Sequence, residues 1–207
     1  MNSGKKRRLV GNKAFAATVV VIVILVAVLI WQSVKPQFGS TGVSLPPMTM
    51  TVVGLNGTQV VLNSGDIADF VSYRAYGGFV NQIGNVMGLG NYTGVPLTVL
   101  CNLVGGLSNF TSLSITASDQ YNVTLNYEQV GGNWTTYDNV TGLQVSQTQP
   151  LTPILAYYFD DVNLTSDQGP LRLAIVGPEG LLTASRYWVY SVVRIEVLNA
   201  SAEEFRS

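Results

Sequence analysis

The side chains that could carry chemistry are few. The chain has 207 residues, with one cysteine and no histidine. The lack of histidine removes the most common transition-metal ligand and general base, and with it any Ser-His-Asp triad. In "PLTVLCNLV", one face of a helix would carry Leu97, Leu100, Cys101 and Val104, spaced at i, i+3, i+4 and i+7. We therefore expect the Cys101 thiol to pack in a core as a small apolar group, not to act as a nucleophile or metal ligand.

Acidic side chains form one further cluster, in "FDDVNLTSDQG". Asp160, Asp161 and Asp167 supply the oxygen ligands that calcium prefers, but their spacing does not match an EF-hand loop. A turn rich in Asp and Asn between two strands is the simpler interpretation. No pair of carboxylates can be placed for acid–base work. We assign no catalytic, cofactor-binding or metal-ligating residue from the sequence.

The N-terminal region has the pattern of a membrane anchor. Residues 14–31 read "AFAATVVVIVILVAVLIW" without a charge, and as a helix they would extend about 27 Å, close to the thickness of a bilayer core. Basic residues gather just before them, at Lys5, Lys6, Arg7, Arg8 and Lys13. This asymmetry predicts one transmembrane helix with a cytoplasmic N-terminus and an external C-terminal part. No basic cluster remains on that part, so we expect no nucleic-acid partner.

Two fates of this apolar segment remain open. The stretch "WQSVKPQ" follows it, where a secretory signal would have a small-residue cleavage site, and this favours a retained signal anchor. However, "NKAFAATVVV" resembles an archaeal prepilin signal, in which cleavage here would fall between Lys13 and Ala14. In that alternative the apolar helix would become the core of a filament, and the protein would be a pilin-like surface subunit.

Glycosylation signals occur only after the apolar segment. Eight N-x-Ser/Thr sequons use eight of the thirteen asparagines found there, and seven of the eight have threonine. This enrichment predicts N-linked glycans on an external surface, although a composition rich in Thr and Asn without glycans is the alternative. Few charges, no disulfide and many sequons together suggest an archaeal cell surface. The predicted sites are Asn56, Asn91, Asn109, Asn122, Asn133, Asn139, Asn163 and Asn199.

The remainder of the chain is typical of a mainly β, α+β domain. We divide the chain into a cytoplasmic N-terminus, a transmembrane helix, a linker, an external domain and a C-terminal tail, at residues 1–13, 14–31, 32–48, 49–198 and 199–207. Asn56-Gly57 predicts a hairpin turn, and Ser64 could cap a short helix. Residues 131–149 are polar and read as a long surface loop.

Alternating apolar residues predict further strands. "SLSITASDQYNVTLNY" should form a hairpin whose second strand points Val123, Leu125 and Tyr127 inward. The last strands are expected in "PILAYYF", "LRLAIVG" and "VVRIEVL". In the final one, alternation points Val193, Ile195 and Val197 inward and leaves Arg194 and Glu196 in water.

Five segments together resemble a known family. In order, they are "YTGVPLTVLCNLVGG", "SLSITASDQYNVTLNYEQV", "LTPILAYYFDD", "GPLRLAIVGPEG" and "RYWVYSVVRIEV". This order is similar to that of the molybdopterin-binding domain of sulfite-oxidase-like oxidoreductases, over residues 49–198. The resemblance implies that domain's fold, with a pterin pocket in the family's enzymes, preceded here by one transmembrane helix.

The residues of the family's cofactor site are not matched. In catalytic members a cysteine upstream of the T-G-V-P-L segment binds molybdenum, whereas "YRAYGGFVNQIGN" has no cysteine here. The family's Arg-x-x-Lys-Trp pattern keeps Trp188, but Ala184 and Tyr187 stand at its basic positions. Taken with the predicted anchor and the sequons, this mismatch suggests an archaeal, membrane-anchored member without cofactor that serves binding or structure at the cell surface.

A molybdopterin oxidoreductase with an atypical site, using Arg172 or Arg186 around the cofactor, remains the alternative. A surface protein partner is possible. The face of this chain that binds such a partner would include Tyr73, Arg74, Tyr76, Phe79 and Asn81.

Overall fold

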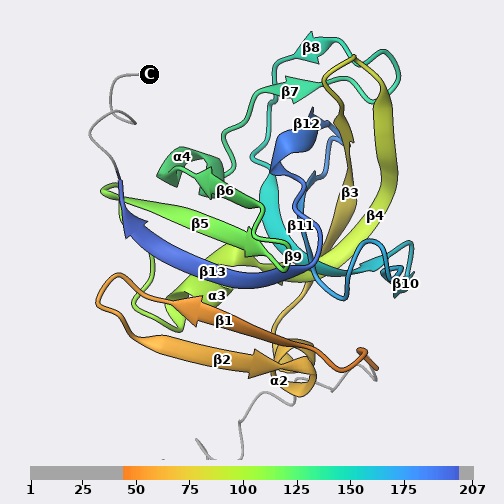
Figure 1. The fold of residues 1–207 in the computed structure, drawn as a ribbon. Coiled ribbons are helices and arrows are strands. Elements are labelled where there is room, and N and C mark those ends of the chain that lie inside the picture. Colours follow the sequence, from red (N-terminus) through yellow and green to blue (C-terminus); the bar gives the residue numbers. More distant parts are fainter. Residues whose placement is uncertain (1–43, 201–207) are drawn as a thin grey trace, which may run out of the picture. The chain divides into compact units, whose positions relative to one another are not determined.

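The computed structural model describes residues 44–200, which fold mainly into β-strands (Figure 1). They belong to one compact unit, Gly42–Ser207. The predicted membrane span at 14–31 and the Lys13–Ala14 junction lie outside the described residues. Within residues 44–200, no helix is long and apolar enough to cross a membrane.

One sheet has five strands and joins the two ends of the domain. Its order is β2 (Gln59–Asn63), β1 (Thr49–Val53), β13 (Val192–Asn199), β5 (Thr111–Ala117) and β6 (Asn122–Leu125). The first and last strands, β1 and β13, pair in parallel, and the other pairs are antiparallel. The hairpin predicted at Asn56-Gly57 is confirmed, since β1 and β2 pair from Val53↔Gln59 onward.

The second sheet closes on itself. Its four main strands are β3 (Tyr73–Val80), β4 (Val86–Pro96), β9 (Thr152–Phe159) and β11 (Arg172–Gly177). Both β4 and β11 pair with β3 on one side and with β9 on the other, so these pairings form a ring. Two short strands, β10 (Val162–Asn163) and β12 (Thr183–Ala184), extend it from β9 and β3. Closure removes exposed edges from the main strands.

Four short helices connect these strands. They are α2 (Ser64–Asp69), α3 (Leu97–Asn102), α4 (Tyr127–Val130) and the 3-10 helix η1 (Ser185–Tyr187). The predicted cap of α2 was wrong by one residue: the Asn63 side chain, not that of Ser64, accepts hydrogen bonds from the backbone N–H groups of Gly65 and Asp66. Asp66 reciprocates by accepting from the Asn63 N–H, which completes a capping box.

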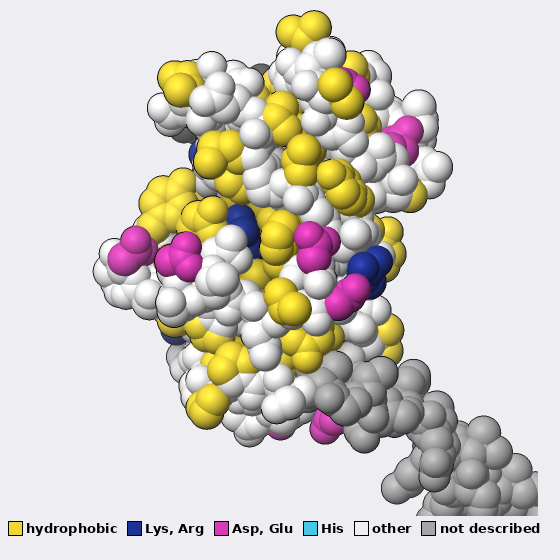
Figure 2. Space-filling model, turned by 90° about the vertical axis from the view of Figure 1, so that its right-hand side faces the viewer, with side chains coloured by type: hydrophobic (Ala, Val, Ile, Leu, Met, Phe, Trp, Pro, Cys, Tyr) yellow, Lys and Arg dark blue, Asp and Glu magenta, His cyan; other side chains and the backbone are white. Residues whose placement is uncertain are grey.

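The core extends across both sheets. Buried side chains from β1, β5 and β13 meet those of β9 and β11 and of helix α3 in one apolar cluster. On the outside, Figure 2 shows the face that carries β4 and β10, where few charged side chains lie among hydrophobic and uncharged ones. The low charge content of the sequence is therefore also a property of this surface.

Three sequence predictions need correction. Tyr127 does not continue β6, because Asn126 caps α4 and leaves Tyr127 exposed in that helix. Val193 is 37% exposed, because a bulge between Val192 and Arg194 shifts the alternation and buries Val192 instead. The predicted loop 131–149 contains β7 (Thr136–Tyr137) and β8 (Gln144–Val145), which pair with each other, and it buries Trp134.

Candidate functional site

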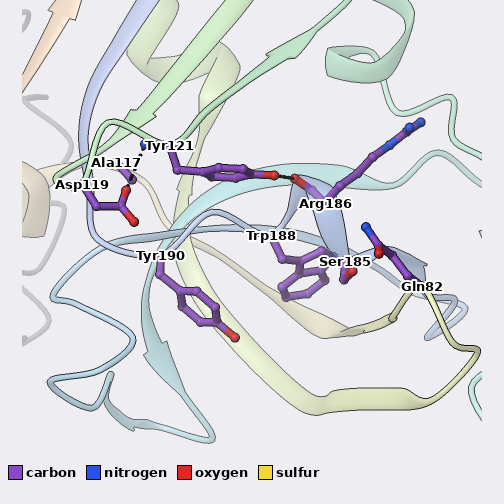
Figure 3. A pocket seen from close by; sticks show the side chains of 8 residues that line it. All are labelled: Gln82, Ala117, Asp119, Tyr121, Ser185, Arg186, Trp188 and Tyr190. Carbon is purple, nitrogen blue, oxygen red and sulfur yellow. Dashed lines mark hydrogen bonds between the residues drawn. The ribbon is translucent and has the colours of Figure 1, made fainter.

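A hollow of about 380 Å³ lies where turns from both sheets meet η1 (Figure 3). The turn after β3 contributes Gln82, the end of β5 and its turn contribute Asp119 and Tyr121, and η1 contributes Ser185. The remaining lining residues are Ala117, Arg186, Trp188 and Tyr190. Aromatic rings and hydrogen-bonding groups thus share one concave surface, which is the usual make-up of a ligand site.

A second hollow adjoins the first. It has a volume of about 500 Å³ and shares Gln82, Ser185 and Arg186 with its neighbour. Its other walls come from the ends of β3 and β12 and from the 137–142 segment. Together the two hollows form one extended concave surface around Ser185 and Arg186.

Hydrogen bonds hold two of the lining rings in place. The Tyr121 hydroxyl donates to the backbone carbonyl of Arg186 at 2.9 Å, which ties the β5–β6 turn to η1. The same turn is closed by the Asp119 carboxylate, which accepts from the Tyr121 N–H at 2.9 Å. Inside the wall, Trp188 Nε1 donates to Thr183 Oγ1 at 2.8 Å. Figure 3 shows the Arg186 side chain extending away from the rings.

Tyr190 is positioned by a strained turn. The next residue, Ser191, has a φ of 48°, which costs energy for a residue with a side chain. Two backbone hydrogen bonds stabilise this conformation, from the Ser191 N–H to Gln168 and from the Ser118 N–H to the Ser191 carbonyl. Gly169 lies so close to Ser191 that an added Cβ would be 2.6 Å from the Ser191 Cα. The surrounding packing therefore fixes this turn.

An unpaired arginine lies behind the aromatic wall. Arg172 begins β11 and is 1% exposed, and its guanidinium carbon lies 4.3 Å from the Tyr190 ring centroid and 5.1 Å from that of Trp188. The third ring, Tyr92, is 5.3 Å away. The Nε and Nη2 atoms of Arg172 are buried without a hydrogen-bond partner. Within residues 44–200 the ion pairs are Arg74–Asp161 and Arg194–Glu196, so no carboxylate neutralises Arg172 there. A buried charge without a partner is costly and requires explanation.

Cys101 belongs to the core, as predicted. It lies on α3 with no exposed surface, beside the buried Leu97 and Leu100. Burial raises the pKa of the Cys101 thiol to about 12. Among the described residues, no group of three or more Cys, Asp or Glu side chains could hold a metal ion.

The thiol state of Cys101 gives a direct test. With a pKa of about 12, the thiol stays protonated at pH 9, where an exposed cysteine is largely thiolate. We expect native protein to react with a disulfide reagent at pH 9 at least about 100-fold more slowly than urea-unfolded protein. Equal rates would show that Cys101 is accessible.

The acidic cluster stabilises a turn. Asp160 and Asp161 connect β9 to β10 with positive φ values of 45° and 65°. Asp161 accepts from Arg74 Nε and Nη2, both at 2.9 Å, and this bond lowers the pKa of Asp161. Asp160 accepts from the Asn91 N–H. Asp167 hydrogen-bonds Thr165, which lowers the pKa of Asp167. The three carboxylates are therefore engaged in hydrogen bonds within the protein.

The residues of the predicted binding face on β3 do not meet in either hollow. Phe79 is buried against Trp188, with ring centroids 5.4 Å apart, and Arg74 forms an ion pair with Asp161. Asn81 lines the second hollow, but its side-chain oxygen accepts from two backbone N–H groups of the β3–β4 turn. Tyr73 and Tyr76 line neither hollow.

The sequence analysis missed three residues that line the first hollow: Asp119, Tyr121 and Tyr190. They lie in two turns that are far apart in the sequence and become neighbours because β5 pairs with β13.

All eight predicted glycosylation sites lie within the described residues. Asn91 and Asn139 are half-buried and the other six asparagines are exposed. In β6, the Asn122 side chain donates to Ser114 Oγ and Thr116 Oγ1 on the neighbouring strand. Alternation along a strand also puts the asparagine and threonine of a sequon on the same face. Occupancy by glycans remains a prediction.

Comparison with known proteins finds similarity in structure and none in sequence. No family model and no curated protein matches the sequence. Among solved structures, the sulfane dehydrogenase SoxCD from Paracoccus pantotrophus is similar, with a TM-score of 0.52 and 19% sequence identity. The match covers 75% of this chain and 39% of that chain. The shared property is the fold. It supports a distant resemblance to the sulfite-oxidase-like domain that the sequence indicated.

The residues present do not fit a molybdenum site. The family's metal ligand is a thiolate, and the single thiol of this chain is enclosed in the core. Ala184 and Tyr187, at the family's basic positions, supply no cation. One feature does suit an anionic group, namely the unpaired guanidinium of Arg172. Among residues 44–200, the hollow therefore has no thiolate ligand for a metal, and a buried positive charge lies behind its aromatic wall.

Proposed function

We propose that this protein is a membrane-anchored, glycosylated extracytoplasmic domain of sulfite-oxidase-like fold that binds a ligand or partner at the cell surface without catalysing a redox reaction. In this proposal, residues 14–31 span the membrane once and the N-terminus stays in the cytoplasm, as on an archaeal cell. The observation that carries the non-catalytic part is the position of Cys101. Its thiol is enclosed in the core, and no other cysteine exists to ligate molybdenum.

A binding role is supported by the hollow beside η1. Its walls carry exposed tyrosines and hydrogen-bonding side chains. The bond from Tyr121 to Arg186 joins elements far apart in the sequence, and a local bond to Thr183 holds Trp188. Preorganised concave sites of this kind lower the entropy lost on binding. The domain thus has the means to bind a small molecule or a protruding chain.

Metal analysis of the native protein tests this proposal. We expect full-length protein purified from its own host to contain neither stoichiometric molybdenum by elemental analysis nor fluorescent pterin after oxidation. Native material is needed because not every foreign host makes and inserts the cofactor. Molybdenum near one atom per chain, together with pterin, would overturn the proposal. Protease treatment of intact cells tests the topology, since an external domain should be digested while an internal control protein survives.

One observation favours a second function, a molybdopterin-dependent oxidoreductase with an atypical site. The Arg172 guanidinium has two N–H groups, on Nε and Nη2, without an acceptor among residues 44–200. They are buried behind the aromatic rings, so a phosphate could accept charge-assisted hydrogen bonds from them only if these rings moved aside. In that case Arg172 would hold an anionic part of the cofactor, and the metal would need a ligand other than a thiolate. The same metal analysis separates the two functions.

A further inference from the structure

The hollow beside η1 has a chemistry that points to a particular class of ligand. We propose that it binds a neutral saccharide, with sugar C–H groups against the rings of Tyr121 and Tyr190 and sugar hydroxyls bound by Asp119, Gln82 and Ser185. This inference rests on the proposed function, since it takes the hollow as a binding site and not as a redox centre. It adds the identity of the ligand.

The two tyrosines supply the apolar part of this site. Tyr121 and Tyr190 are 48% and 40% exposed, on two sides of one hollow. The faces of aromatic rings are electron-rich, so they attract the slightly positive C–H groups that line one side of a pyranose ring. Trp188 is buried and contributes an edge between them. An exposed aromatic pair of this kind fits a ligand that is apolar on its faces and polar around its rim.

Hydrogen-bonding groups in the hollow are available to such a rim. One oxygen of Asp119 accepts from the Tyr121 N–H, and no bond to the other oxygen is found among residues 44–200. Within the same residues, the Gln82 amide and the Ser185 hydroxyl also make no hydrogen bond. A carboxylate, an amide and a hydroxyl can donate to and accept from neighbouring sugar hydroxyls. One small cavity therefore offers both hydrogen-bond donors and hydrogen-bond acceptors.

Charge argues for a neutral ligand. Two tyrosines, a tryptophan and an aspartate resemble a cage for an organic cation. Here, however, the Arg172 guanidinium already lies against the Tyr190 and Trp188 rings, 4.3 and 5.1 Å from their centroids. A second cation would be repelled by this unpaired charge. An anion in the hollow would instead meet the Asp119 carboxylate, while Arg172 lies behind the rings and does not line the cavity. The Arg186 side chain extends away from the rings and donates to the Tyr187 hydroxyl at 2.9 Å (Figure 3).

Binding of simple sugars to the full-length chain tests the inference. The chain should be made without N-glycans and held in a detergent that has no sugar headgroup, so that neither competes for the hollow. The probes are methyl α-mannoside, methyl β-glucoside and N-acetylglucosamine. Choline is tested as a cationic ligand and sulfate as an anionic ligand. We expect one sugar to bind with a Kd of about 1 mM, measured by calorimetry and by saturation-transfer NMR.

Variants locate the binding. Tyr190→Ala should weaken affinity about tenfold or more, since it removes one stacking face. Asp119→Asn should weaken it about fivefold while its side-chain oxygen can still accept from the Tyr121 N–H, so this variant retains the turn. The matched control is Tyr127→Ala, because Tyr127 is 46% exposed on α4 and does not line the hollow. It should change affinity less than about twofold.

Three results would overturn the inference: no sugar binding up to about 50 mM, tighter binding of choline or sulfate than of any sugar, or unchanged affinity in both Tyr190→Ala and Asp119→Asn. Any of these in a molybdenum-free protein would leave the proposed binding role intact and remove the saccharide. Molybdenum with pterin in the native protein would remove the binding role itself. The two failures are therefore distinguishable.

Discussion

Replacing Gly94 with alanine is expected to lower the free energy of unfolding by about 3 kcal/mol or more. Gly94 lies in β4 opposite Ala156 of β9, next to a register shift between Thr93 and Gly94. A Cβ added there would overlap the carbonyl oxygen of Leu155 and lie 2.5 Å from the Ala156 Cα. Both atoms belong to the backbone of a buried strand, so no side chain can rotate to make room.

The effect should be large because of the closed ring of strands. Separating β4 from β9 would open that ring, and β9 is buried along most of its length. The disturbance would also reach the candidate site, because Ala156 pairs on its other side with Arg172. Urea unfolding followed by tryptophan fluorescence measures the change, through the midpoint at a constant slope.

Gly131→Ala provides the control. Gly131 has an ordinary φ of −72°, and the nearest atom to an added Cβ is the Glu128 carbonyl oxygen at 3.3 Å. We expect its free energy of unfolding to change by less than about 1 kcal/mol. Equal losses in both variants would show that the close approach of β4 and β9 is not what requires glycine at position 94.

Local patterns predicted most of the strands because each depends on nearby residues. Alternation identified β5 and β13, and Asn56-Gly57 placed the first hairpin correctly. The failures have equally local causes. At Val193 a bulge inserts one residue into the alternation, and at Tyr127 the cap formed by Asn126 starts a helix where a strand seemed to continue. A bulge depends on the partner strand, and a side-chain cap depends on a particular rotamer. Neither can be predicted from the periodicity of apolar residues alone.

The candidate site was much less predictable than the fold. The position of Cys101 followed from helical spacing alone. By contrast, Asp119 and Tyr121 meet Tyr190 because β13 pairs with β5 across 70 or more intervening residues. No feature of the local sequence marks these two turns as neighbours. Arg172 lay in a recognised strand, but its lack of a partner is visible only when every surrounding side chain is placed.

Replacing Arg172 with methionine is expected to raise the free energy of unfolding by about 1–3 kcal/mol. Three ring contacts favour the guanidinium, each by about 0.5–2 kcal/mol. Against them stand the desolvation of the charge, which costs several kcal/mol, and two buried N–H groups without acceptors, at about 1–3 kcal/mol each. Methionine has a similar length, fills the same space and keeps favourable contacts between sulfur and the rings. Thermal and urea unfolding of both proteins measure the difference.

The matched control is Arg194→Met. Arg194 is on β13 with its side chain 37% exposed, and it pairs with Glu196 at 3.0 Å. Because this pair is accessible to water and salt, we expect its loss to change stability by less than about 1 kcal/mol. A similar gain in both variants would mean that methionine stabilises these strands for reasons unrelated to a buried charge.

The sign of the Arg172 result bears directly on function. A gain in stability means that no bound anion compensates the charge of Arg172 in the purified protein. A loss of about 3 kcal/mol or more in the native protein, absent after the protein has been unfolded and refolded without ligand, would instead mean that removing the guanidinium breaks a charge pair with a bound group. The three ring contacts persist in the refolded protein, so they do not account for such a difference. No residue among 44–200 can supply that negative charge, since the ion pairs there involve Arg74 and Arg194. A bound anion would then be the simplest source, because a ligand that binds the folded state alone stabilises it. That outcome would favour the oxidoreductase over the binding domain, and it would do so without any assay of activity.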